Sequence, residues 1–95
     1  MPDLEALLDH KNPYFRISLS VSLMRIDPKS QKALAALKVL LQDPDSEIRR
    51  KTVSSLEDIG PEAAPANALV KVALEDSDPD VRDIAARVLR AVGKQ

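Results

Sequence analysis

The chain has 95 residues and a mass of 10.4 kDa, the size of one small domain. Hydrophobic residues make up 44% and charged residues 31%, which favours a folded domain over a disordered one, while only 2% aromatic residues argue against an aromatic cage or a platform for stacked bases. The net charge of -1 gives no general attraction to nucleic acid or to an anionic membrane, and the absence of cysteine excludes disulfide bonds, cysteine-zinc sites and thiol nucleophiles.

No segment of the sequence has the composition of a membrane anchor or a secretion signal. The apolar runs are only a few residues long, whereas a membrane-spanning helix needs about 20 apolar residues. The start, Met1-Pro2-Asp3, lacks the basic residues of a signal peptide. We therefore expect a cytoplasmic protein that does not associate with a membrane.

The sequence repeats itself with a period of 33 residues. Leu41 lies 33 residues after Leu8, and Leu74 lies 33 residues after Leu41. The register continues through further equivalent sets: Leu23, Leu56 and Leu89; Ile26, Ile59 and Val92; Lys38 and Lys71; Val39 and Val72. A register held over so many positions predicts a single repeat domain. This domain, 1–95, is divided into a half unit, two whole units and a second half unit: 1–8, 9–41, 42–74 and 75–95.

Each unit is predicted to contain a longer first helix and a shorter second helix. The first helices are expected over about 13–26, 46–59 and 79–92. Each follows a residue whose side-chain oxygen can accept a hydrogen bond from the first turn: Asn12, Asp45 and Asp78. Gly60 and Gly93 are expected to end these helices in the left-handed conformation, with Asp27 as the substitute in the first unit.

The second helices are expected over about 29–42 and 64–75, which are rich in alanine and leucine. Residues 3–8 align with 36–41 and predict a short second helix at the start of the chain. Glycine is too scarce, and the alternation of apolar and polar residues too weak, for strands. The predicted fold class is all-α, a stack of antiparallel helical hairpins.

Two segments carry a motif that resembles a known repeat. The pattern Leu-x-Asp-x-Asp-x-x-Ile/Val-Arg is present over 41–49 and 74–82, and Ile59-Gly60-Pro61-Glu62-Ala63 lies between them. These motifs resemble HEAT repeats, and they are most similar to the short bacterial and archaeal subtype also seen in phycobilisome lyase-like proteins. The signatures of ankyrin and tetratricopeptide repeats are missing. The first unit departs from the pattern, with His10-Lys11-Asn12 in place of Asp-x-Asp.

The resemblance implies a right-handed α-solenoid of about five helices. Its first helices would lie on the convex side, and its second helices would line a concave surface. Members of the family use that surface mostly to bind other proteins, although a fold alone does not determine a function.

The sequence offers no group of residues suited to catalysis, to a metal or to a cofactor. Residues 76–80, Asp-Ser-Asp-Pro-Asp, imitate the opening of a calcium loop, but Val81 and Arg87 stand where that loop needs glycine and glutamate. His10 is the only histidine, so a second imidazole for a metal is missing and no serine is expected to have a base beside it. We therefore expect a non-catalytic domain without a cofactor or a metal.

One arginine recurs at the same position of every unit, as Arg16, Arg49 and Arg82. One interpretation is a row of arginines that binds a ligand. The other is a structural ladder in which each guanidinium bridges loop carboxylates, such as Asp43 or Asp76 of an adjacent unit. The family resemblance favours the ladder.

The first helix of the first unit carries an apolar stripe where the other units are charged or polar. The stripe consists of Tyr14, Ile17, Val21 and Met24. Its counterparts in the next unit are Glu47, Arg50, Ser54 and Glu57. At about 100° per residue the stripe lies nearly opposite the expected core face, which is Phe15, Leu19, Leu23 and Ile26. We predict either a docking patch for a protein or a surface that residues 1–8 cover.

The last helix carries Ile84 and Val88 where the other units have polar residues. The end of a solenoid is normally polar, so this end is predicted to be covered by further repeats or by another chain. A second copy is one candidate. It would bind head to tail, which requires closure into a ring, or as a two-fold dimer through the stripe that contains Ile17 and Val21.

The second helices carry small apolar residues bordered by lysines. Val39 and Val72 occupy equivalent positions away from the leucines of the expected core, and Lys38 and Lys71 lie beside them. Such rows suit an acidic amphipathic peptide or helix laid along the predicted concave surface. The alternative is an ordinary solvated helix surface.

The sequence thus predicts a protein-protein interaction or scaffold module whose partner it does not identify. The module would bind through the second-helix surface, through the terminal apolar patches or through both. Nucleic-acid binding is the first alternative, because some HEAT-like folds hold DNA in a basic groove. The net charge of -1 and the single tyrosine and phenylalanine argue against it. An accessory domain of an enzyme resembling the phycobilin lyases is the second alternative.

Overall fold

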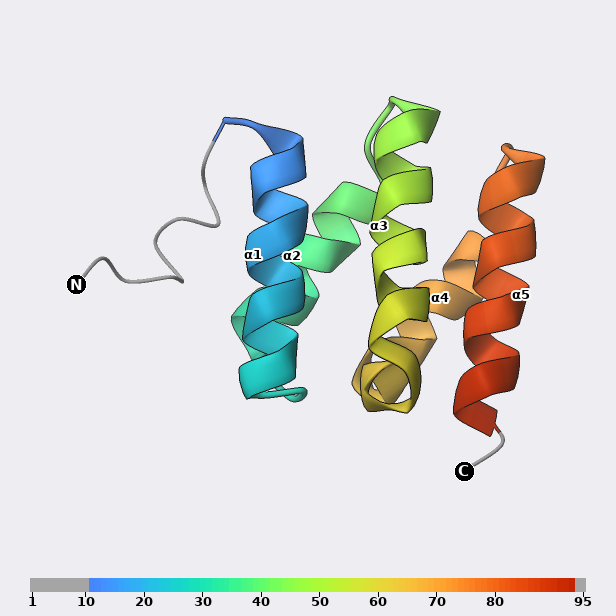
Figure 1. Cartoon of the computed structure of the whole chain (residues 1–95). Helices are drawn as coiled ribbons and strands as arrows, with labels where there is room; N and C mark the ends of the chain where they lie inside the picture. The colour runs from blue at the N-terminus through green and yellow to red at the C-terminus, as the bar shows by residue number, and fades with distance from the viewer. Residues whose placement is uncertain (1–10, 94–95) are drawn as a thin grey trace.

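The structure is a computed structural model in which residues 11–93 are described. Within this range the chain forms five α-helices, one 3-10 helix and no strand: α1 (Pro13–Ile26), α2 (Gln31–Leu41), α3 (Ser46–Ile59), η2 (Gly60–Ala66), α4 (Asn67–Ala73) and α5 (Pro79–Gly93) (Figure 1). The all-α prediction is confirmed, and the first helices agree with their predicted bounds to within one residue. The short helix predicted for residues 3–8 lies outside the described residues.

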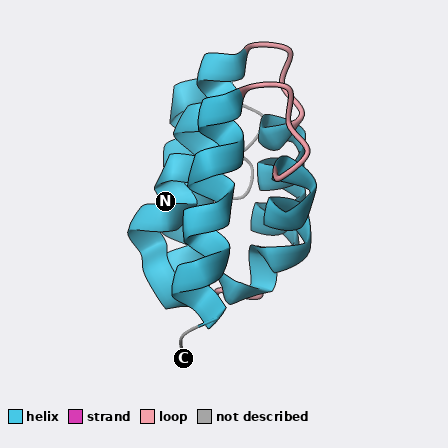
Figure 2. Cartoon of the chain, turned by 90° about the vertical axis from the view of Figure 1, so that its right-hand side faces the viewer, coloured by secondary structure: helices cyan, strands magenta, loops and turns pink. Residues whose placement is uncertain are grey.

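The helices form two layers. The first helices of the units, α1, α3 and α5, lie side by side in one row, with α1 against α3 and α3 against α5 (Figure 1). The second helices, α2 and α4, form the other layer, which Figure 2 shows edge-on. α2 contacts α1 and α3, whereas in the next unit η2 contacts α3 and α4 contacts α5. This arrangement of antiparallel hairpins is that of an α-solenoid.

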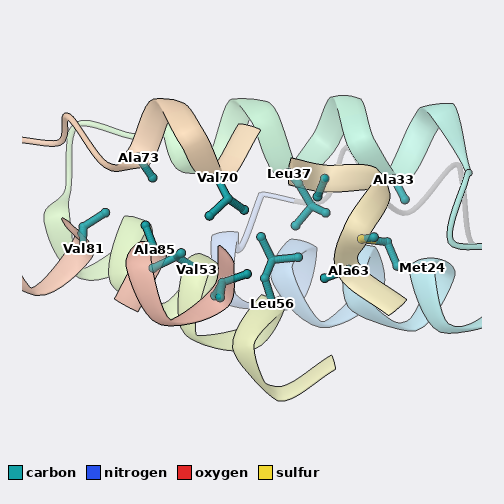
Figure 3. Close-up of a cluster of buried hydrophobic side chains, with 12 residues drawn as sticks. Met24, Ala33, Leu37, Val53, Leu56, Ala63, Val70, Ala73, Val81 and Ala85 are labelled. Carbon is teal, nitrogen blue, oxygen red and sulfur yellow. The ribbon is translucent and has the colours of Figure 1, made fainter. Parts of the chain in front are cut away.

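The hydrophobic core lies between the two layers. Leu37 of α2 and Val70 of α4 point from one layer toward Val53 and Leu56 of α3 in the other (Figure 3). All four side chains are fully buried. Burying a leucine or valine side chain contributes about 1.5–3 kcal/mol to folding, so this layer contact is a main source of stability.

The N-terminal ends of the first helices are capped as the sequence predicts. The side-chain oxygen of Asn12 accepts a hydrogen bond from the backbone N–H of Tyr14 at 2.9 Å. Asp45 accepts in the same way from Glu47 at 2.9 Å. In the third unit, Asp78 Oδ1 accepts from the backbone N–H two residues later at 2.8 Å. Each cap satisfies a donor that the helix itself cannot pair.

The C-terminal ends differ in part from the prediction. Gly60 has φ 75° and ψ -142°, so it provides the positive φ that was expected after α3. Asp27 does not: its φ is -143°, and the chain leaves α1 in an extended conformation with the Asp27 carboxylate accepting from the Lys29 N–H at 3.1 Å. An aspartate avoids the steric cost of positive φ in this way. The last helix continues through Gly93 instead of ending before it.

Replacing Gly60 with L-alanine is expected to lower the free energy of unfolding by about 1–3 kcal/mol, because only glycine adopts this combination of φ and ψ without strain. A Cβ atom at Gly60 would meet no atom within 4 Å, so the whole effect comes from the backbone. The measurement is urea unfolding followed by circular dichroism. D-alanine, introduced by chemical synthesis, is the control, because it favours positive φ; an equal loss for both alanines would contradict this explanation.

The second helix of the second unit is shorter than predicted. Instead of one helix over 64–75, the chain forms the 3-10 helix η2 followed by the seven-residue α4. Pro65 lies inside η2. Proline has no N–H to donate, and its ring collides with the carbonyl four residues before it, so an α-helix is disfavoured there. In the first unit α2 lacks such a proline and has 11 residues, capped by Ser30.

Candidate protein-interaction surface

The outer side of the second-helix layer carries the valines and lysines that the sequence predicted to lie together. Val39 of α2 and Val72 of α4 are 59% and 67% exposed, although valine is among the residues most often buried in folded proteins. Lys38 and Lys71 precede them and are exposed as well. The residues on the opposite side of the same helices, including Leu37, are buried in the core. The helix geometry therefore presents both valines and both lysines away from the core.

The charges within helices α2 and α4 have one sign. The only charged residues within α2 and α4 are Lys32, Lys38 and Lys71. By contrast, α3 and α5 mix acidic and basic residues along their length. A chain with a net charge of -1 thus concentrates lysines on the second-helix layer. The local field there favours a negatively charged partner.

A pocket of about 70 Å³ lies where the two second helices meet. Its lining includes two predicted site residues, Lys38 and Val72. The other lining residues were not predicted as site residues: Leu41, Gln42, Leu69, Ala73 and Asp76. The sequence indicated only that Leu41 and Leu69 are apolar. Their position at the mouth of a pocket depends on how α4 sits against α2, which a single sequence does not reveal.

The prediction of an exposed apolar stripe on α1 is wrong at Ile17 and Met24, and the alternative that residues 1–8 cover the stripe lies outside the described residues. Ile17 is 5% exposed and Met24 is fully buried, while Val21 is half-buried and Tyr14 is exposed. Ile17 packs with Leu40 and Ile48, and Val21 packs against these three.

The stripe is the side of the helix that faces the neighbouring unit. In the next unit the equivalents of Ile17 and Met24 are Arg50 and Glu57, and both pair with the following unit. The nitrogens of Arg50 lie 3.7 Å from carboxylate oxygens of Asp78 and Asp80. Arg87 Nε lies 2.7 Å from Glu57 Oε2. The first helix of the first unit, α1, also contacts the unit that follows it, but through apolar side chains such as Ile17.

The expected core face of α1 is also wrong at both ends, because Phe15 is 39% exposed and Ile26 is 73% exposed. On α5, Val88 is buried in the main core and Ile84 packs against it, so neither forms the exposed patch predicted at that end. The structure therefore leaves Lys38, Val39, Lys71 and Val72 exposed on α2 and α4 and buries, fully or in part, most of the other predicted residues.

Tyr14 lies apart from this surface, near the N-terminal end of α3. Partial desolvation raises the pKa of its phenol, and the negative charges of Glu47 and Asp45 raise it further. The phenol therefore stays neutral at physiological pH. Tyr14 is therefore an exposed side chain with a neutral phenol.

The arginine ladder is confirmed between the second and third units. Arg49 Nε donates to Asp76 Oδ2 at 2.9 Å, and its Nη1 donates to the carbonyl oxygen of Asp43 at 2.6 Å. Arg82 repeats only the carbonyl contact, with Nη1 donating to the Asp76 carbonyl at 2.7 Å. Among the described residues Arg16 makes no ion pair with Asp43, so the ladder does not extend to the first unit there.

Two carboxylates between α3 and α5 hold their charge more strongly than usual. The hydrogen bond from Arg87 lowers the pKa of Glu57 from 4.5 and outweighs desolvation. Desolvation by itself would raise the pKa of Asp78, but backbone hydrogen bonds from Asp80 and Val81 lower it below 3.8 on balance, with help from Arg50.

Both lowered pKa values predict acid sensitivity. A carboxylate whose pKa is lower in the folded state stabilises the fold above the pKa of the unfolded state, and this contribution is lost as the pH falls through the folded-state pKa. We expect an unchanged urea midpoint from pH 7 to pH 5, then a modest decline below about pH 4.5. Glu57→Gln should flatten part of this decline, whereas Asp58→Asn, an exposed acid on the same helix, should not. Equal pH profiles for both variants would contradict the assignment.

Over residues 11–93 no cluster of three or more histidine or acidic residues could hold a metal ion, and no helix is long and apolar enough to span a bilayer. What this part of the chain does offer is the lysine-bordered apolar surface described above. Its chemistry suits binding.

Comparison with known protein families agrees with the architecture. The family described as HEAT repeats matches residues 1–93, nearly the whole chain. The chain belongs to the HEAT-repeat family. No curated protein and no solved structure matched this HEAT-repeat chain. HEAT repeats generally mediate protein-protein interactions.

Proposed function

We propose that this HEAT-repeat chain is a non-catalytic protein-interaction module that binds an acidic, amphipathic helix or peptide on the outer side of α2 and α4. The observation that carries this proposal is the pair of exposed valines, Val39 and Val72, in equivalent positions of adjacent second helices. Exposed valines in register on neighbouring helices form an apolar strip that a single partner segment can cover.

The lysines and the pocket support a partner of defined character. Lys38 and Lys71 border the valines, and no acidic residue lies within either helix, so carboxylates on the partner would be attracted. The pocket of about 70 Å³ between Leu41, Leu69 and Val72 suits one small apolar anchor. A partner helix would then need an apolar face with acidic flanks.

The test uses a synthetic amphipathic helix with leucines on one face and glutamates beside them, added to the isotope-labelled chain and followed by NMR. We expect chemical-shift changes at residues of α2 and α4, chiefly at 38–42 and 69–76. Val72→Asp is expected to weaken binding at least about tenfold, because it places a carboxylate in the apolar strip. A peptide in which lysine replaces every glutamate is the matched control.

Shift changes on α3 or α5 in place of α2 and α4 would contradict the proposed surface. Equal binding of the glutamate and lysine peptides would contradict the proposed charge. Lys51→Glu, an exposed reversal on α3, is the matched protein control and should leave binding unchanged.

Nucleic-acid binding is the second candidate, favoured only by the three lysines of this layer. A site with so few phosphate contacts and no exposed aromatic ring on α2 or α4 would bind weakly and with a shallow salt dependence. A steep loss of DNA affinity with salt would support this candidate. The accessory role in a lyase-like enzyme rests only on the resemblance of the motifs at 41–49 and 74–82 to the lyase-like subtype, and co-purification of a chromophore or a catalytic subunit would support it.

A further inference from the structure

The side of α5 that faces away from the rest of the row is defined by the way α3 contacts α5. Arg49, Arg50 and Glu57 of α3 all reach the following unit, as the ion pairs above show. The residues 33 positions later are Arg82, Asp83 and Arg90. These three side chains are exposed, and no described element lies beyond α5 in the row (Figure 1). We call them, together with Ala86, the outer face of α5.

The charges of this face are not neutralised within the described residues. Neither Asp83 nor Arg90 makes an ion pair there. Arg87, one turn after Asp83, is held by Glu57 through two hydrogen bonds of 2.7 and 3.3 Å. Arg82 uses one nitrogen for a backbone carbonyl, and no described carboxylate meets the others. Asp83 interacts electrostatically with Arg87, but neither it nor Arg90 forms an ion pair within the described residues, so this face keeps charges that a partner could pair.

The signs of these charges oppose the addition of another unit like those already present. At two equivalent positions the charge changes sign between α3 and α5. Arg50 corresponds to Asp83, and Glu57 corresponds to Arg90. Asp80 is the residue that approaches Arg50, so a further unit of this type would bring its acid to Asp83. Like charges in contact are destabilising. A stacked repeat with an acid at the position of Asp80 would therefore be disfavoured at this face.

The same reversal makes the face complementary to itself. Asp83 and Arg90 are seven residues apart, two helical turns, and so lie on one side of α5. If a second α5 packs antiparallel and crosses between Ala86 and Arg87, Asp83 of each copy lies at the height of Arg90 of the other. Arg82 then lies near the C-terminal end of the second α5, where helix carbonyls favour a cation.

We propose that two copies of this chain form a two-fold dimer through α5, held by two reciprocal ion pairs between Asp83 and Arg90. The small side chain of Ala86 at the centre permits the close approach of about 8–10 Å that packed helices need. Such an interface is small and polar, which implies a weak dimer that loosens as salt is added. The second-helix layer stays open, so the dimer does not depend on the proposed function.

The test is the solution mass of the full chain by sedimentation, from about 10 µM to about 1 mM. We expect the wild type to shift toward dimer with concentration at low salt. Asp83→Arg and Arg90→Asp should each weaken the dimer at least about tenfold, because each turns two attractions into two repulsions. Mixing the two variants should restore a dimer, since one then carries two cations and the other two anions. Lys51→Glu is the control reversal and should change nothing.

Three results would overturn the dimer: a wild type that stays monomeric over the whole range, single reversals that leave the mass unchanged, or a mixture of the two variants that stays monomeric. Circular dichroism checks that the variants fold. If a reversal loses helicity, Asp83→Asn and Arg90→Gln replace it. These should weaken the dimer, and mixing them should restore it in part, because the mixed dimer keeps one of the two Asp83–Arg90 pairs; no recovery on mixing would count against the reciprocal pairs.

Discussion

Leu56→Ala is expected to lower the free energy of unfolding by about 2–5 kcal/mol. Leu56 lies on α3, is fully buried and belongs to the core between the two layers (Figure 3). Its truncation removes apolar contacts and leaves a cavity that the neighbouring helices cannot fill. A small domain has a total stability of about 5–15 kcal/mol, so this single change would remove a large share of it.

Urea unfolding monitored by circular dichroism measures this loss, with Val39→Ala as the matched control. Val39 is 59% exposed, and its truncation is expected to change stability by no more than about 0.5 kcal/mol. The same comparison tests the assignment of faces, because both residues are apolar and helical. Similar losses for the two variants would mean that the valine surface is part of the core.

Arg49→Gln is expected to cost about 2–4 kcal/mol, somewhat less than the loss for a fully buried ion pair. The side chains of Arg49 and Asp76 are only 13% and 11% exposed. Without the guanidinium, the Asp76 carboxylate loses its counter-ion and the Asp43 carbonyl loses its donor. An uncompensated, largely buried charge is what makes such a substitution costly.

Arg82→Gln is the control for this prediction, because the repeat supplies the same arginine in a different environment. Arg82 is exposed and makes only the carbonyl contact, so its loss should cost about 0.5–1.5 kcal/mol. Equal losses at the two positions would show that the backbone contact carries the energy. A larger loss at Arg49 assigns the difference to the carboxylate of the next unit.

The elements of the fold were predictable because their signals are local. Asn12, Asp45 and Asp78 cap the helices that follow them, and the 33-residue register places the equivalent helices without any knowledge of packing. Pro65 was the exception. The repeat aligned its segment with α2, but a proline inside the first turns changed the local hydrogen bonding and left a shorter helix.

The faces of α1 were not predictable by the same reasoning. The sequence predicts the core on one side of the helix, so a stripe nearly opposite to it is expected to be exposed. In a row of parallel helices, however, a first helix is contacted by the second layer and by its neighbour in the row. Ile17 and Met24 occupy the neighbour-facing positions and are buried there. The contact between neighbouring units differs in chemistry. It is apolar between α1 and α3 and ionic between α3 and the unit that contains α5.

The second-helix surface was predictable in composition and not in shape. The 33-residue register predicts that Val39 lies beside Val72 and Lys38 beside Lys71. The pocket is lined by residues of α2 and α4 and by residues that follow them, so its shape depends on how α4 packs against α2. Equivalent positions in a repeat do not determine that packing.

The 3-10 segment before α4 also has a consequence for local opening. Lys71 and Val72 lie on a helix of seven residues that is entered through a tighter and poorer hydrogen-bonding geometry. Backbone amides in such an element exchange with solvent through local opening, at a lower free energy than global unfolding requires. The half of the surface that lies on α4 is therefore expected to open more readily than the half on α2. A partner that lies across both helices would slow amide exchange in α4 most, and it would spend part of its binding energy on fixing that helix.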